Sequence, residues 1–141
     1  MHLEINGERV IKDIQADFNL AYPYLKIEFF NSAVQYHNYV PQQKTENILP
    51  LKNILRNKII PVSVEITDQM TVTELESIFM QRFGLYAQVF RKSGGIWLET
   101  TLTDKWTLKQ QNDHGREISQ EPVYKSKQAG TDFDLSRDAA H

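Results

Sequence analysis

Apolar positions recur along the chain with two periods, and the change from one period to the other marks the expected elements. Residues 62–66 alternate apolar and polar side chains, a period of two that predicts a half-buried strand. Over 72–83 the apolar side chains fall three and four residues apart, which predicts a helix with one apolar face. Thr71 and Glu74 form a capping-box pattern at its start, and Gly84 stands where a helix commonly ends.

Alternation returns after this helix in the stretch FRKSGGIWLETT. Two alternating runs, 86–91 and 96–101, flank a Lys-Ser-Gly-Gly turn whose two glycines can take the positive φ values of a tight hairpin. The pattern predicts a two-stranded hairpin. Its aliphatic side, with Ile96 and Leu98, is expected to pack against the preceding helix.

A weak internal similarity relates residues 3–30 to residues 64–91. Each stretch reads as a short strand, a helix and a second strand, with apolar side chains at matching places. In the first stretch we expect a helix over 10–21 and a strand over 25–29, because Pro23 prevents the helix from continuing. The chain therefore predicts two β-α-β units, with duplication and chance similarity both left open.

The similarity aligns Leu3 with Val64 in the first strands and Phe29 with Phe90 in the second strands. The Asn6-Gly7 pair leaves an alternative open, because it is a strong signal for a two-residue hairpin turn. In that alternative the first strand pairs with the residues just before the helix.

These elements predict an α+β fold, in which the two β-α-β units form one mainly antiparallel sheet of four or five strands with the helices on one face. A ferredoxin-like plait has this order of elements and is the leading architecture, with a β-grasp arrangement as the alternative. The expected core consists of the inward positions of these elements: Ile5, Ile11, Ile14, Phe18, Leu25, Ile27, Val64, Ile66, Val72, Leu75, Ile78, Phe79, Val89, Ile96 and Leu98.

A last helix is expected after the hairpin. Thr103 or Asp104 caps it, Trp106 starts it, and Gly115 ends it, because glycine is common just past the end of a helix. Trp106 and Leu108 do not fall on one helical face. This helix is therefore expected to dock through its first turn.

The chain has the length of one domain, which we expect over residues 1–118. Within it, residues 31–49 are expected to form an exposed loop, since the first part of this segment is polar. Residues 119–141 contain few large apolar side chains, which is the composition of a flexible tail.

Composition and charge fit a cytoplasmic protein. Hydrophobic residues make up 40% of the chain, enough for a core, and the net charge of −2 creates no field that would draw the chain to nucleic acid or to an anionic membrane. The absence of cysteine excludes thiol catalysis, thiolate metal sites and disulfides. No signal-peptide pattern and no apolar run of membrane-spanning length occurs, so we expect a cytoplasmic location.

Sequence motifs for catalysis and cofactor binding are absent. No phosphate-binding glycine loop, nucleophile elbow or metalloprotease helix motif occurs. The four histidines, His2, His37, His114 and His141, are far apart in the sequence, which argues against a local metal site. We therefore expect no catalytic residue, metal or cofactor and a protein without enzymatic activity; a small-molecule enzyme of unknown type is left as an alternative.

The hairpin carries the candidate interaction surface: Phe90, Arg91, Lys92 and Trp97. Tryptophan and arginine often anchor protein interfaces, and an uncovered face with apolar aromatic residues is typical of a surface that binds a protein partner. The preferred function is a protein-interaction or assembly module, with a protein partner or self-association through the sheet. The alternative is a nucleic-acid-binding module that uses the 86–101 hairpin and the basic segment 52–58.

Two resemblances add to this interpretation. The stretches MTVTELESIF and GLYAQVFRKSGGIWLETTLTDKWTLKQQN, with a start like LEING, resemble a group of small uncharacterised bacterial proteins over about residues 1–120. This resemblance implies a bacterial source and no particular activity. The opening HLEINGE is similar to the sulfur-carrier members of the ubiquitin-like β-grasp family, which use a C-terminal Gly-Gly. This chain ends Ala139-Ala140-His141, so this resemblance implies the fold and not the carrier chemistry.

Overall fold

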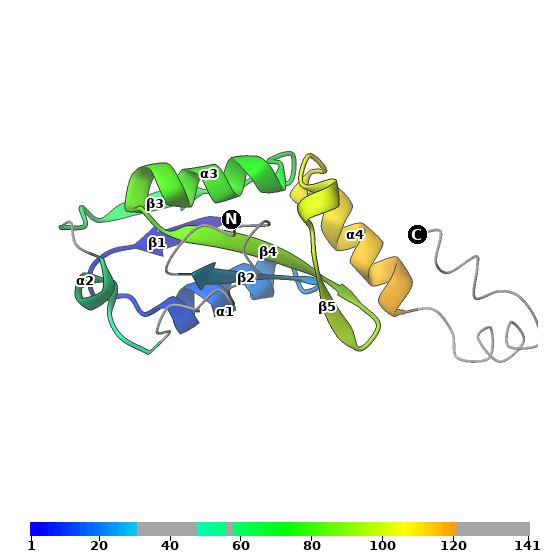
Figure 1. Cartoon of the computed structure of the whole chain (residues 1–141), viewed down its shortest axis with the longest axis horizontal. Helices are drawn as coiled ribbons and strands as arrows, with labels where there is room; N and C mark the ends of the chain where they lie inside the picture. Colours follow the sequence, from blue (N-terminus) through cyan, green and yellow to red (C-terminus); the bar gives the residue numbers. More distant parts are fainter. Residues whose placement is uncertain (31–47, 56–57, 121–141) are drawn as a thin grey trace, which may run out of the picture.

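In the computed structural model, the described residues are 1–30, 48–55 and 58–120, and they form five strands, four α-helices and one 3-10 turn. In chain order the elements are β1 (His2–Ile5), α1 (Ile11–Ala21), β2 (Leu25–Phe30), α2 (Leu51–Ile54), β3 (Val62–Glu65), α3 (Val72–Phe83), β4 (Tyr86–Ser93), β5 (Ile96–Glu99), η1 (Thr101–Thr103) and α4 (Leu108–Ser119). Figure 1 shows strands between α3 on one side and α1 on the other, with α2 and α4 at opposite ends of the molecule.

The strands form two antiparallel sheets, and the α+β class is confirmed. β1 pairs with β3 in a two-stranded sheet, while β2, β4 and β5 form a three-stranded sheet in that order. The expected single sheet of four or five strands is therefore wrong, and so is the ferredoxin-like plait, in which both β-α-β units share one sheet. Alternation along a strand tells which face is buried, but not which strand lies beside it. That choice depends on contacts between residues far apart in the sequence.

The three-stranded sheet has an inner face that the helices cover. Leu25, Ile27 and Phe29 of β2 lie on this face, and the strand register places Val89 of β4 directly opposite Ile27. From α3, the ring of Phe79 packs edge-on against Phe29, with 5.0 Å between ring centroids. α4 also contacts β4 and β2. Helices therefore pack against the larger sheet through its strands β2 and β4.

The two β-α-β units pair strand for strand, β1 with β3 and β2 with β4. Leu3 lies opposite Val64, the two residues that the sequence comparison aligned. The second strands begin at aligned positions, Leu25 and Tyr86, but their inward positions differ by one residue: the register places Ile27 of β2 on the same face as Val89 of β4. As a result, Phe29 is buried in the core while Phe90 lies on the opposite face, and their predicted match is wrong. Duplication stays a prediction.

Local signals set the bounds of α3 as predicted. The Thr71 hydroxyl accepts a hydrogen bond from the backbone N–H of Glu74, and the Glu74 carboxylate accepts one from the backbone N–H of Thr71. Gly84 ends the helix with a left-handed φ of 68°. The hairpin alternative at Asn6-Gly7 does not form. Instead, the Asn6 side chain accepts from two backbone N–H groups that follow it, in a turn that leads toward α1.

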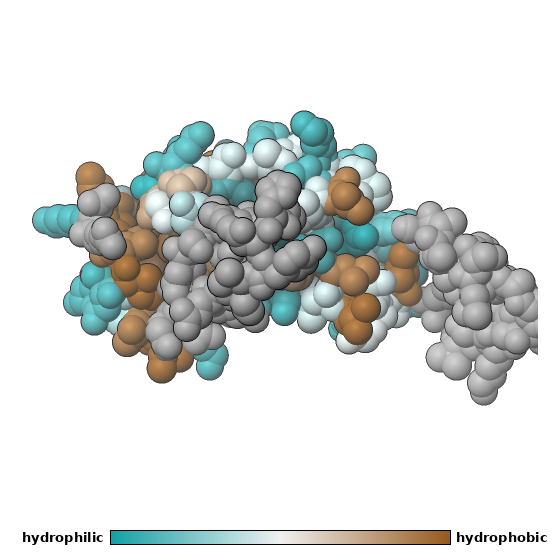
Figure 2. All heavy atoms as spheres, viewed as in Figure 1, coloured by the Kyte–Doolittle hydropathy of each residue, from teal (hydrophilic) through white to brown (hydrophobic). Residues whose placement is uncertain are grey.

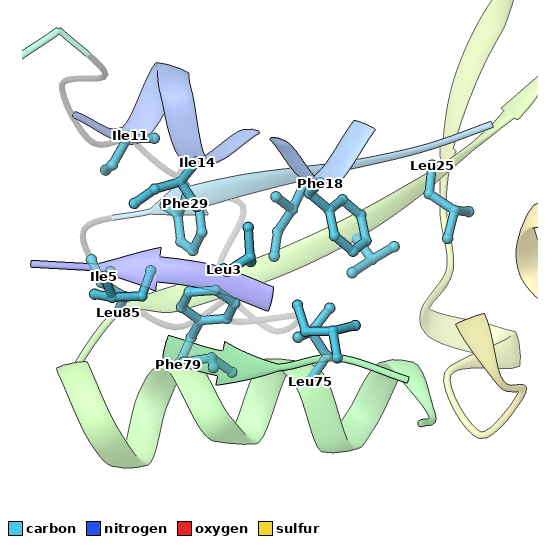
Figure 3. Packing of buried hydrophobic residues seen from close by; sticks show 14 of the residues in the cluster. Leu3, Ile5, Ile11, Ile14, Phe18, Leu25, Phe29, Leu75, Phe79 and Leu85 are labelled. Atoms are coloured by element: carbon cyan, nitrogen blue, oxygen red, sulfur yellow. The ribbon is translucent and has the colours of Figure 1, made fainter. Parts of the chain in front are cut away.

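Both sheets and the helices contribute to one hydrophobic core (Figure 3). Phe18, Phe29 and Phe79 are its largest fully buried side chains. Most of the predicted core is confirmed, with Ile78 only partly buried. The prediction is wrong for two residues of β5, Ile96 and Leu98, which are exposed. β5 is the outermost strand of its sheet, and the helices pack against β2 and β4 rather than over it.

The last helix differs from its prediction at both ends. Thr107 caps it in a capping box with Gln110, and the predicted end at Gly115 is wrong, because α4 continues for one more turn. Close packing explains this glycine inside a helix. A Cβ atom at Gly115 would lie 2.9 Å from the Cβ atom of Tyr24 and 3.1 Å from the carbonyl oxygen of Lys92.

Most of the predicted loop over 31–49 and of the predicted tail over 119–141 lies outside the described residues, which include only 48–49 and 119–120 of these two segments. The domain boundary at residue 118 stays a prediction. None of the helices in the described part of the chain has the length and apolar character needed to cross a membrane.

Candidate functional site

The β4–β5 hairpin holds the four residues predicted for interaction and divides them between the two faces of the sheet. Phe90, Lys92 and Trp97 lie on the outer face, where Lys92 stands directly opposite Trp97 in the strand register. Arg91 lies on the inner face, opposite Leu98. The structure therefore brings three of the four together and separates Arg91 from them.

On the outer face, a lysine of β2 contacts both aromatic rings. The Lys26 ammonium lies 5.3 Å from the ring centroid of Phe90 and 5.2 Å from that of Trp97, within the range of cation–π attraction. The same ammonium lies 3.3 Å from the Glu28 carboxylate, and Glu99 stands opposite Phe90. This face combines half-buried rings with charges of both signs.

Arg91 joins the hairpin to α4. Its guanidinium donates a hydrogen bond of 2.7 Å to the side-chain oxygen of Gln111 and lies 5.7 Å from the centroid of the Trp106 ring. Burial lowers the pKa of this guanidinium from its ordinary value. The Gln111 side chain donates in turn to the backbone oxygen of Thr103 at 2.7 Å. Arg91 thus positions β4 against α4.

An apolar surface is left uncovered along β5 and the residues that follow it. Ile96 is 60% exposed and Leu98 40%, Leu102 in η1 is fully exposed, and Trp106 before α4 is 37% exposed. We call these four residues the β5 surface. Figure 2 shows hydrophobic residues at the molecular surface where β5 lies. Exposed apolar residues that gather in this way are typical of interaction sites.

The sequence placed Ile96 and Leu98 on the correct face of the hairpin but in the wrong environment. Alternation has the same period whether a helix covers the strand or not, so it does not distinguish a core strand from an uncovered edge. One signal was available. Leu102 lies between two threonines outside any periodic pattern, which indicates an apolar residue without a place in the core.

β5 also has a free backbone edge, because among the described residues it pairs only with β4. The N–H of Lys92 donates across β4 to the backbone oxygen of Tyr24, on the β2 side. By alternation, Leu98 therefore forms the hydrogen-bonded pair between β5 and β4. The backbone N–H groups of Trp97 and Glu99 then point away from β4, toward the free edge.

A partly buried carboxyl group completes the hydrogen bonding of β4 where β5 ends. The carboxylate of Glu76, on α3, accepts a hydrogen bond of 3.0 Å from the backbone N–H of Val89. Burial raises the pKa of Glu76 to about 7; the negative charge of Asp104 adds to this effect, and the hydrogen bond from Val89 opposes it. The sequence did not single out Glu76, because a carboxylate next to the core position Leu75 resembles any residue at the border of a helix face.

The basic segment 52–58 does not join the hairpin. Lys52 lies in α2, at the opposite end of the molecule from β5 (Figure 1). Its ammonium is 2.8 Å from the carboxylate of Glu8. Arg56, in the middle of the segment, lies outside the described residues. In the described part of the chain, the two elements of the nucleic-acid alternative therefore do not form one surface.

The histidines are not brought together in the described part of the chain. His2 lies on β1, 3.9 Å from a carboxylate of β3. The His114 ring packs edge-on against Trp106, with 5.5 Å between centroids. His37 and His141 lie outside the described residues. Within residues 1–30, 48–55 and 58–120, no group of three or more potential ligand side chains could hold a metal ion.

Comparison of the chain with protein-family models, with curated proteins and with solved structures finds no match in any of the three. The resemblance to small bacterial proteins therefore stays a prediction. The function has to be argued from the geometry of the β5 surface and its surroundings.

Proposed function

We propose that this protein is an interaction module that associates with a second copy of itself along β5. The observation that carries the proposal is the uncovered β5 surface: Ile96 and Leu98 of an edge strand are exposed, and so are Leu102 and Trp106 farther along the chain. Exposed apolar patches mark interaction surfaces, and a free strand edge offers unpaired backbone groups to another chain. The exposed apolar side chains and the unpaired backbone edge of β5 thus both favour contact with another chain.

The β5 strand is complementary to itself about a two-fold axis. When two β5 edges pair antiparallel with Trp97 opposite Trp97 of the second copy, Ile96 of each strand lies opposite Leu98 of the other. Opposite side chains on one face of an antiparallel pair contact each other. This pairing joins the two sheets into one and places Ile96 of each copy in contact with Leu98 of the other.

The sequence of β5 supports pairing rather than protection of the edge. Exposed edge strands usually carry lysine, proline or a bulge, which prevent another strand from adding to the sheet. β5 reads Ile-Trp-Leu-Glu, with its single charged residue, Glu99, at the last position.

We propose the cytoplasm as the site of this assembly, because a chain without cysteine has no need of an oxidising compartment.

Substitution of Leu98 by lysine is expected to abolish the assembly. A lysine at this position would place two ammonium groups in the apolar contact, one from each copy, and the dissociation constant should rise about a hundredfold or more. Light scattering after gel filtration, over a range of protein concentrations, gives the mass. Leu20→Lys is the matched control, since Leu20 on α1 is an exposed leucine outside the β5 surface.

The expected result is a dimer for the wild type and for L20K, and a monomer for L98K. A monomeric wild type at all concentrations tested, or an equal effect of both substitutions, contradicts the proposal. Titration with random oligonucleotides gives a second readout. Binding that weakens steeply with salt and is unaffected by L98K would support the nucleic-acid alternative instead.

A further inference from the structure

A cavity of about 760 Å³ lies at the α2 end of the molecule, away from the hairpin. The turn after β1, α2 and the residues before β3 line it. A second cavity, of about 570 Å³, shares Leu55, Lys58, Ile59 and Pro61 with the first and reaches the end of α3 at Phe83. Sites for small molecules in proteins commonly have volumes of about 300–1,000 Å³.

The walls of these adjoining cavities are mainly apolar where the two cavities meet, at Leu55, Ile59 and Pro61. Leu55 and Ile59 are partly buried and pack against the hydrophobic core, and Phe83 does the same from α3. Met80 adds a flexible apolar side chain to the second cavity. Figure 2 shows hydrophobic residues gathered at this end of the molecule. The walls therefore suit an aliphatic chain.

The charged groups around the cavities are mainly cations. Lys52, Lys58 and Arg82 line them, against one carboxylate, Glu8. Glu8 is already paired, because its carboxylate lies 2.8 Å from the Lys52 ammonium. Lys58 and Arg82 have no ion-pair partner in the described part of the chain. An anionic group on a ligand would therefore meet two positive charges that form no ion pair with a described carboxylate.

We propose that these cavities bind an elongated amphipathic anion, with a carboxylate head and an unbranched aliphatic chain. Lys58 and Arg82 bind the head through charge-assisted hydrogen bonds, and Leu55, Ile59 and Phe83 contact the chain. Two cations are too few to follow a polynucleotide backbone, and the aliphatic walls provide no series of rings on which bases could stack. The site lies at the opposite end from β5 and does not depend on the proposed assembly.

Calorimetric titration with sodium dodecanoate, below its micelle concentration, tests the proposal. We expect saturable binding of one dodecanoate per chain and a clearly weaker affinity for the neutral analogue 1-dodecanol. Lys58→Gln and Arg82→Gln should each weaken dodecanoate binding about tenfold, because each removes one charged contact with the head. Lys105→Gln, which removes an exposed cation near the start of α4, is the matched control and should bind as the wild type does.

The absence of saturable binding overturns the proposal. Equal affinities for K58Q, R82Q and K105Q overturn it as well, because dodecanoate then binds elsewhere. A third arm uses vesicles of phosphatidylglycerol. Binding to these vesicles without binding of free dodecanoate would assign the surface to a lipid bilayer and reject the cavity as a site for a single amphipathic anion. Circular dichroism of each variant checks that the substitution has not unfolded the protein.

Discussion

Replacement of Gly115 by alanine is expected to destabilise the fold by about 1–3 kcal/mol, although alanine is the better helix former. The added Cβ would lie 2.9 Å from the Cβ atom of Tyr24 and 3.1 Å from the carbonyl oxygen of Lys92. Neither of these atoms can rotate away, because each belongs to the backbone or is fixed to it. α4 must therefore move off β4, which also disturbs the hydrogen bond between Arg91 and Gln111.

Urea denaturation of the two proteins measures this loss as a difference in the free energy of unfolding. Gly95→Ala is the matched control, because a Cβ at Gly95 meets no atom within 4 Å and this glycine has no positive φ. The control should stay within about 0.5 kcal/mol of the wild type. If G115A is as stable as the wild type or more stable, the close approach of α4 to β4 is contradicted.

The stability of the wild type is expected to fall as the pH rises from 5 to 8, in part because of Glu76. Burial raises the pKa of this carboxyl group from 4.5 to about 7 in the folded protein. The folded state therefore favours the protonated form. Its contribution to stability is complete below pH 4.5 and is lost as the pH rises through about 7. A pKa difference of this size corresponds to about 3 kcal/mol in the free energy of unfolding.

Glu76→Gln should remove this contribution to the pH dependence. The amide oxygen can still accept the hydrogen bond from the backbone N–H of Val89, so the variant should be more stable than the wild type at pH 8. The wild type and E76Q contain the same histidines. The difference between their free energies of unfolding at each pH therefore excludes the histidine titration. Glu117→Gln, on the exposed side of α4, is the control and should follow the wild-type curve. Parallel curves for wild type and E76Q would reject a raised pKa for Glu76.

The elements of this fold could be predicted where a local signal exists. The capping box of Thr71 and Glu74, the left-handed Gly84 and the apolar face of α3 are read from neighbouring residues, and all three are confirmed. The pairing of β2 with β4 could not be predicted, because it joins residues 56 to 66 positions apart. Gly115 shows the same limit. Its local signal indicates a helix end, and the contact with Tyr24 that explains it is distant in the sequence.

The candidate site was predicted only in part, because some of its features depend on contacts between residues far apart in the sequence. The sequence located the hairpin and divided its side chains between two faces, as the register of β4 and β5 confirms. It expected Ile96 and Leu98 in the core, because alternation does not reveal whether a helix covers a strand. The free edge of β5 and the inward position of Arg91 under α4 depend on the arrangement of the whole sheet.

The most direct measurement of the proposed assembly uses the absence of cysteine in this chain. Opposite residues in an antiparallel pair have Cα atoms about 4.5–5.5 Å apart, within the range that a disulfide spans. Trp97→Cys therefore places two thiols together on the two-fold axis, and mild oxidation should give a covalent dimer that reducing agent separates. Leu20→Cys, on α1, should remain monomeric under the same conditions. If W97C forms no more covalent dimer than L20C, association through β5 is contradicted.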